Sequence, residues 1–173
     1  MCWGPKHKVS SDIYLANLNS RRIRRITYNH GSSEPAYNGS YLAWKQGRPG
    51  GTRFVDGTIR LMSLATGRTV IASVRMPGRG HPRCATKDTY IQACADEPVI
   101  SSDILEWTLN NGIVIVARNL RTGTQYPVFQ ELGKLNSPSS YRPRNVWGNR
   151  IVWVSLRRRG NTVNLSIATA LVP

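Results

Sequence analysis

The sequence predicts an all-β fold built from a repeated four-stranded antiparallel unit. Two recurring segments indicate this unit, and no stretch of useful length has helical periodicity. The chain has 173 residues, which is about the size of one ordinary domain. We therefore expect a single globular domain over residues 1–173.

The first recurring segment contains a proline near its start and closes on a tryptophan. EPAYNGSYLAW occupies residues 34–44 and EPVISSDILEW residues 97–107, each with a spacing of nine from proline to tryptophan. A third copy, RPRNVWGNRIVW, occupies residues 142–153 and has one extra residue. Each copy places a polar turn between two short β-like runs, which predicts two strands joined by a hairpin.

A second segment follows each tryptophan and supplies two further strands. Its apolar positions begin with a period of two, as in a half-buried strand. These positions are Ile13, Leu15 and Leu18; Ile59, Leu61 and Leu64; Ile115, Ala117 and Leu120. Each segment ends in a polar pair that suits a tight turn, and a fourth β-like run follows at residues 22–27, 69–74 and 124–129.

One unit is therefore a four-stranded antiparallel meander. Repeated meanders of roughly 40 to 50 residues are typical of β-propeller blades packed face to face around an axis. The sequence predicts a β-propeller of about three to four blades, or part of a larger propeller. In this arrangement a large ring fills the gap between blades, so we assign a structural role to Trp44, Trp107 and Trp153.

The expected blades divide the chain unevenly. They are a partial blade at residues 1–33, a full blade at 34–80, a full blade at 97–140 and a partial blade at 141–173, with a cysteine-containing insertion at 75–96. The terminal pieces do not complement each other. The chain is then a fragment of a larger propeller, a small irregular ring, or a protein that completes itself by self-association through open blade edges.

The two segments together resemble the TolB-like or WD-type β-propeller repeats of bacterial periplasmic and cell-surface proteins. The resemblance covers nearly the whole chain and implies an extracellular or periplasmic binding scaffold. Members of that family carry acidic residues after the tryptophan and before the Leu-x-Thr-Gly ending. Those places here hold Lys45, Thr108 and Val154, and Asn17, Ser63 and Asn119, so the family's acidic loop chemistry is lost or replaced.

Cys84 and Cys94 lie in the insertion, with nine residues between them. This spacing fits no common zinc motif, and we predict a disulfide that closes the insertion. Such a bridge agrees with an oxidising compartment. Two reduced cysteines remain the alternative, and Cys2 is left over.

Positive charge dominates the composition, with 24 Lys plus Arg against nine Asp plus Glu. This excess attracts polyanions in general, but the codon bias of a GC-rich genome explains the many arginines equally well. Arg48, Arg53, Arg157, Arg158 and Arg159 are the candidate binding residues, because they fall in the expected loop after the tryptophan of their units. Equivalent loops of a propeller share one rim, where recognition usually resides.

No catalytic, metal-binding or phosphate-binding motif is recognisable. We therefore predict that the chain is not an enzyme and needs no cofactor or metal. No apolar run approaches about 18 residues, so no membrane span is expected. The predicted function is a secreted or periplasmic scaffold for a protein partner. The alternative is a propeller that binds an anionic glycan or nucleic acid through its basic loops.

Overall fold

The computed structural model describes residues 11–47, 58–73, 95–109, 114–130, 144–159 and 162–173. These residues form strands and turns and contain no helix. No helix capable of crossing a membrane is therefore found in the described ranges. The prediction of an all-β fold with four-stranded antiparallel sheets is confirmed for this part of the chain.

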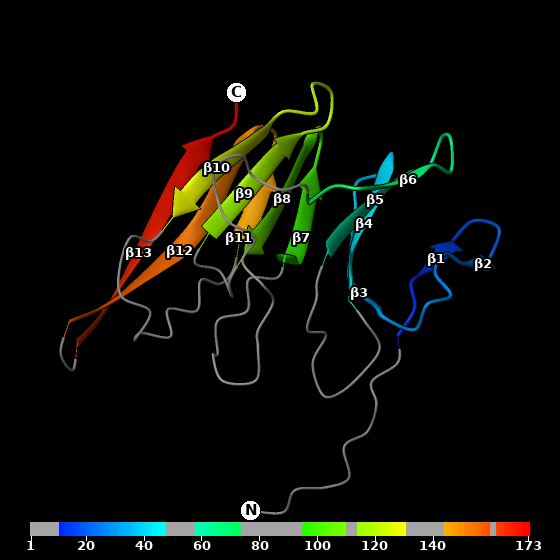
Figure 1. Cartoon of the computed structure of the whole chain (residues 1–173), viewed down its shortest axis with the longest axis horizontal. Helices are drawn as coiled ribbons and strands as arrows, with labels where there is room; N and C mark the ends of the chain where they lie inside the picture. The colour runs from blue at the N-terminus through cyan, green and yellow to red at the C-terminus, as the bar shows by residue number, and fades with distance from the viewer. Residues whose placement is uncertain (1–10, 48–57, 74–94, 110–113, 131–143, 160–161) are drawn as a thin grey trace, which may run out of the picture.

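The strands form four antiparallel sheets, each made of consecutive segments (Figure 1). The first is a two-stranded ribbon of β1 (Tyr14–Asn17) and β2 (Arg22–Arg25). A four-stranded sheet follows, with β3 (Ser32–Tyr37), β4 (Tyr41–Gln46), β5 (Thr58–Ser63) and β6 (Thr69–Ile71) in that order. The next sheet contains β7 (Ala95–Ser101), β8 (Ile104–Leu109), β9 (Val114–Asn119) and β10 (Gln125–Gln130). The last has three strands, β11 (Arg144–Trp147), β12 (Arg150–Arg159) and β13 (Thr162–Leu171).

The Leu-x-Thr-Gly ending forms the turn between the third and fourth strands because it provides a glycine and a side-chain acceptor. Gly67 and Gly123 have φ of 69° and 74°, where a side chain would be strained. The Asn119 Oδ1 accepts hydrogen bonds from the backbone N–H groups of Arg121 and Thr122. Asparagine therefore keeps the turn-capping acceptor at a place where the resemblance led us to expect aspartate.

Neighbouring sheets pack face to face with a constant polarity. We call the side that carries the tryptophan of the second strand the tryptophan face, and the other side the reverse face. The Trp107 side chain packs with Ala43, Ile59 and Leu61 of the preceding sheet. Trp153 packs with Ile104 and Ile115 of its preceding sheet in the same way. Each tryptophan face thus lies on the reverse face of the sheet before it.

The tryptophans occupy equivalent positions and are all buried. Trp44, Trp107 and Trp153 lie on β4, β8 and β12, each the second strand of its sheet. Trp44 packs with Ile13 beside the ribbon β1–β2, so three successive interfaces contain this ring. A large apolar ring between sheets excludes water over an area that smaller side chains would leave unfilled.

The last hairpin corrects one expectation. Arg157, Arg158 and Arg159 do not lie in a loop; they belong to β12 and pair with Asn164, Val163 and Thr162 of β13. Only Gly160 and Asn161 separate the two strands in sequence, and this residue pair is typical of a tight hairpin. Pairing therefore continues to Arg159, whereas β4 and β8 end two residues after their tryptophans.

Two other predictions stay predictions. Cys2, Cys84 and Cys94 lie outside the described residues, and with them the disulfide expected between Cys84 and Cys94. The blade boundaries remain predictions as well, although the sheets begin and end near them.

Candidate binding surface at one rim

Antiparallel order gives the stack two different rims. The turn rim carries the short turns at residues 38–40, 64–68, 102–103, 120–124 and 148–149. The connection rim is where the chain leaves β4, β6, β8 and β10 and where β12 ends. Eleven residues separate β4 from β5, but four separate β8 from β9 and two separate β12 from β13. Variation between units is therefore concentrated at the connection rim.

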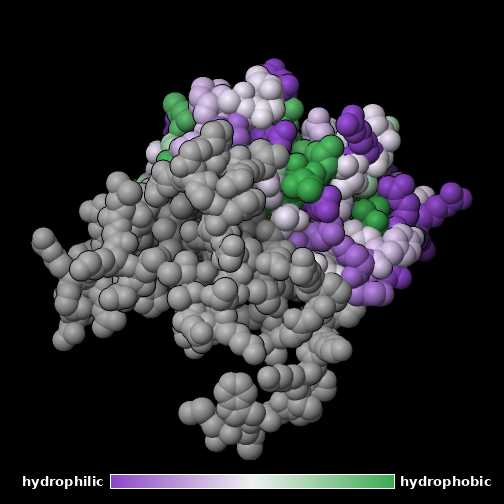
Figure 2. Space-filling view, viewed as in Figure 1, coloured by the Kyte–Doolittle hydropathy of each residue, from purple (hydrophilic) through white to green (hydrophobic). Residues whose placement is uncertain are grey.

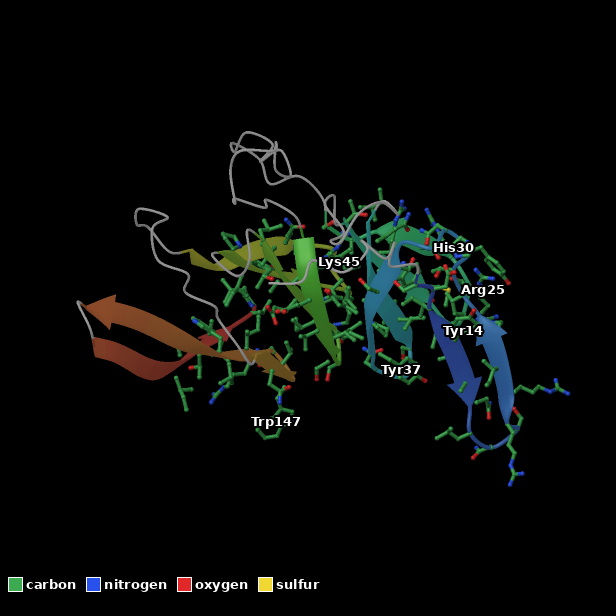
Figure 3. All side chains as sticks on the ribbon, turned by 90° about the horizontal axis from the view of Figure 1, so that it is seen from below. Tyr14, Arg25, His30, Tyr37, Lys45 and Trp147 are labelled. Atoms are coloured by element: carbon green, nitrogen blue, oxygen red, sulfur yellow. The ribbon has the colours of Figure 1, made fainter. Side chains whose placement is uncertain are left out.

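Hydrogen bonds between sheets show that equivalent segments share a rim. The Asn38 Nδ2 donates to the Ser102 carbonyl over 2.6 Å, which joins two neighbouring turns of the turn rim. Figure 3 shows Tyr37 and Trp147 on one side of the molecule, near the turn rim. Lys45 and His30 lie on the opposite side, near the connection rim.

A carboxylate, an ammonium and a backbone amide meet near the start of β3 and β7, at the connection rim. The Glu34 Oε2 accepts a hydrogen bond of 2.9 Å from the backbone N–H of Glu97. The other carboxylate oxygen, Oε1, lies 3.8 Å from the Lys45 Nζ. Lys45 is buried on the reverse face, on the same side as Ala43 and Ile59. Glu34 therefore bridges its own sheet to the next one and faces a largely desolvated positive charge.

Glu34 and Glu97 occupy equivalent irregularities in the first strand of each four-stranded sheet. Their φ values are 55° and 49°, and each precedes a proline. The register shifts at both places, between Ser33 and Ala36 and between Asp96 and Val99. A non-glycine residue in this conformation costs on the order of 1 kcal/mol or more, and strain of this kind is concentrated at functional sites. The bulge also turns the glutamate out of the sheet, which lets Glu34 reach the neighbouring strand.

Asp12 organises a second polar cluster where the ribbon meets β3. Its side chain is 5% exposed and lies 2.5 Å from the Arg25 guanidinium and 2.9 Å from the His30 Nδ1. It also accepts hydrogen bonds from the Thr27 hydroxyl and the His30 backbone N–H. Burial acts to raise the pKa of the Asp12 carboxyl, but these hydrogen bonds and the charge of Arg25 outweigh it and hold the pKa below its ordinary value. The same contact raises the pKa of Arg25.

The positive charge predicted for the rim is described only in part. Arg48 and Arg53 lie outside the described residues. Arg157, Arg158 and Arg159 end β12, so the backbone carries them to the connection rim on a strand. Arg21, Arg22 and Arg24 are exposed on the ribbon, which forms the hydrophilic end of the molecule at the right of Figure 2.

Asp12, Glu34 and Lys45 were not among the site residues predicted from the sequence. Asp12 lies 18 positions from His30 in the chain, and no sequence spacing marks a contact of that kind. Lys45 had one signal in the sequence: it follows Trp44, at a position where the family resemblance implies an acidic residue. Within the described ranges, no three His, Cys, Asp or Glu side chains come together to form a metal site.

Comparison with known proteins gives a weak structural likeness. No protein-family model matches the sequence, and no curated protein matches it. A similar solved structure is the uncomplexed acylaminoacyl peptidase of Pyrococcus horikoshii, with 17% sequence identity and a TM-score of 0.47. The match covers 78% of this chain and 19% of the peptidase, so the chain spans about a fifth of that protein's length.

The matched protein is a peptidase, and on this comparison we withdraw the prediction that the chain is not an enzyme. The likeness carries no argument for any activity of this chain. The resemblance to TolB-like or WD-type repeats remains a prediction, since no family model supports it.

Proposed function

We propose that the chain is part of a β-propeller and acts as a scaffold that binds a protein partner through its connection rim. The observation that carries the proposal is the contrast between the rims. The strand pattern repeats from sheet to sheet, whereas the segments that leave the connection rim differ in length and composition. Variable segments on a constant framework are where recognition usually resides.

The face-to-face stacking supports the propeller arrangement. Each four-stranded sheet is a meander, and the tryptophan face of one sheet packs on the reverse face of the sheet before it. A constant rotation at every interface brings such sheets around an axis. The partner then meets a continuous rim that several sheets contribute to. An oxidising, extracellular or periplasmic location remains part of the proposal.

An exchange of connections tests the protein-binding role. Residues 48–57 are replaced by residues 110–113, which make the corresponding connection in the next sheet. We expect the melting temperature to change little, because surface connections tolerate changes in length. Proteins retained from source-cell extract by the immobilised wild-type chain should be lost with this variant. A variant of the opposite rim, Thr122→Ala, serves as the control and should retain them. Equal retention by both variants would remove the connection rim as the binding surface.

The net charge of +15 favours a second candidate function, the binding of an anionic polymer. In this case the logarithm of the affinity for heparin or a single-stranded oligonucleotide falls linearly with the logarithm of the salt concentration. Replacing Arg157, Arg158 and Arg159 by glutamine should reduce that slope by roughly 2 to 3, if each contacts one anionic group. The control replaces Arg21, Arg22 and Arg24, which removes the same charge from the ribbon. If the two triple variants have equal slopes, the β12 arginines supply only net charge.

A further inference from the structure

The hairpin of β12 and β13 reaches further than the equivalent part of the other sheets. β4 and β8 end two residues after their tryptophans, but β12 continues six residues past Trp153, to Arg159. Four additional residues extend the hairpin by roughly 13 Å, at about 3.3 Å per residue. Figure 1 and Figure 3 both show β12 and β13 projecting from the stack of sheets. We call the projecting part, residues 156–159 paired with residues 162–165, the arm.

The strand register gives the arm two faces of different chemistry. Successive residues of a strand alternate between faces, and residues paired across two antiparallel strands share a face. The buried base of the hairpin fixes this register, because Trp153 pairs with Ala168 on the tryptophan face. Steps of two residues outward from this pair give polar pairs on the same face: Ser155 with Ser166, Arg157 with Asn164, and Arg159 with Thr162. We call these six positions the polar arm face. The opposite face carries Leu156 with Leu165, and Arg158 with Val163.

The polar arm face combines residue types that recognise base pairs with a strongly positive stretch of sequence. Arginine donates two hydrogen bonds to guanine O6 and N7, and asparagine pairs with adenine N6 and N7. Serine and threonine hydroxyls bond to either kind of base. Residues 132–173 contain seven Lys or Arg and no Asp or Glu. This charge attracts phosphates, and the polar residues supply the contacts that distinguish bases.

The dimensions of the arm match the major groove of duplex DNA. That groove is about 12 Å wide and about 8.5 Å deep, and it admits a two-stranded β-ribbon. Neighbouring strands lie about 4.8 Å apart, so the two backbones of the arm fit side by side within this width. The length of roughly 13 Å spans about four base pairs, at about 3.4 Å each. The minor groove, about 6 Å wide, is too narrow for two strands.

We propose that the arm lies in the major groove of duplex DNA, with the polar arm face against the base edges. This proposal rests on the second candidate function above, the binding of an anionic polymer, and names the polymer and the contact. The polar arm face lies on the same side of β12 and β13 as the preceding sheet. A further sheet at the end of the stack would cover the reverse face instead, so the proposal does not depend on an uncovered end.

Two double variants that remove equal charge test which face of the arm meets DNA. The polar-face variant carries Arg157→Gln and Arg159→Gln, and the control carries Arg158→Gln and Arg24→Gln. The probe is a duplex of about 20 base pairs, two helical turns, that the wild-type chain enriches from a randomised pool. Fluorescence anisotropy measures the affinity, and circular dichroism with thermal melting checks that each variant folds. We expect affinity to fall at least about tenfold for the polar-face variant and less than about threefold for the control.

A second pair of variants leaves the net charge unchanged. Asn164→Ala removes an amide from the polar arm face, whereas Val163→Ala alters the neighbouring position on the opposite face. We expect Asn164→Ala to weaken binding to the duplex by about fivefold or more, and to change heparin binding by less than about twofold. Val163→Ala should change neither affinity. Heparin carries anionic groups but no bases, so it reports the contribution of charge alone.

Duplex RNA of the same sequence completes the test. Its major groove is deep and narrow and excludes side chains, so we expect DNA to bind at least about tenfold more tightly. Failure to enrich any sequence, equal affinities for DNA and RNA, or equal losses in a variant and its control would each overturn the contact between the arm and the groove. Heparin binding that persists with any of these results would leave the second candidate function intact. If DNA, RNA and heparin all fail to bind, the second candidate function and this proposal both fall.

Discussion

Replacing Trp107 by alanine is expected to lower the free energy of unfolding by about 3 to 5 kcal/mol. The Trp107 side chain is 1% exposed and packs against Ala43 and Ile59 of the preceding sheet. Removing the ring leaves a cavity between two β-sheets, whose backbones are held by their own hydrogen bonds and cannot collapse fully into it. The loss therefore includes both the transfer of the ring to water and the cavity that remains.

Urea denaturation followed by circular dichroism measures this loss, and the chain contains its own control. Trp147→Ala removes the same side chain from a position that is 84% exposed, so its unfolding free energy should change by less than about 0.5 kcal/mol. If the two variants unfold at the same urea concentration, Trp107 does not hold neighbouring sheets together.

Replacing Asp12 by asparagine should give the second large effect, a loss of stability at neutral pH together with a weaker dependence on acid. The variant removes the charge that Arg25 and His30 approach and weakens the acceptor for Thr27. Because the folded state lowers the pKa of Asp12, its contribution to stability is complete above the ordinary pKa of about 3.8. The contribution is lost as the pH falls from there through the lower pKa of the folded state.

Urea midpoints at pH 7, 4 and 2.5 test this prediction. The wild-type chain should lose more stability than the Asp12→Asn variant between pH 4 and pH 2.5, so the two should converge in acid. Asp103→Asn is the matched control, because Asp103 pairs with Arg121 on the surface and both side chains are exposed. A surface pair of this kind contributes little to stability. A difference between wild type and Asp12→Asn that stays constant with pH would show that the lost hydrogen bonds matter and the lowered pKa does not.

The sequence by itself determined the local structure of this protein. The spacing from proline to tryptophan and the Leu-x-Thr-Gly ending mark where strands begin and turn, because both patterns act through residues close together in the chain. Gly67 and Gly123 show this directly, since each provides the positive φ that its turn requires. For the same reason, Arg157, Arg158 and Arg159 were placed wrongly: the repeat predicted a loop, while strand pairing with residues 162–164 continues the hairpin.

Only the tertiary structure decided which residues are buried, paired or left uncovered. Ile59 and Ile167 hold the same register position, yet a following sheet covers the first and no described sheet covers the second. Asp12 acquires its partners because the ribbon folds back toward β3, and Lys45 is buried because the next sheet lies over it. Burial and long-range pairing depend on which surfaces meet in space, and a pattern that repeats along the chain is identical in the middle of a stack and at its ends.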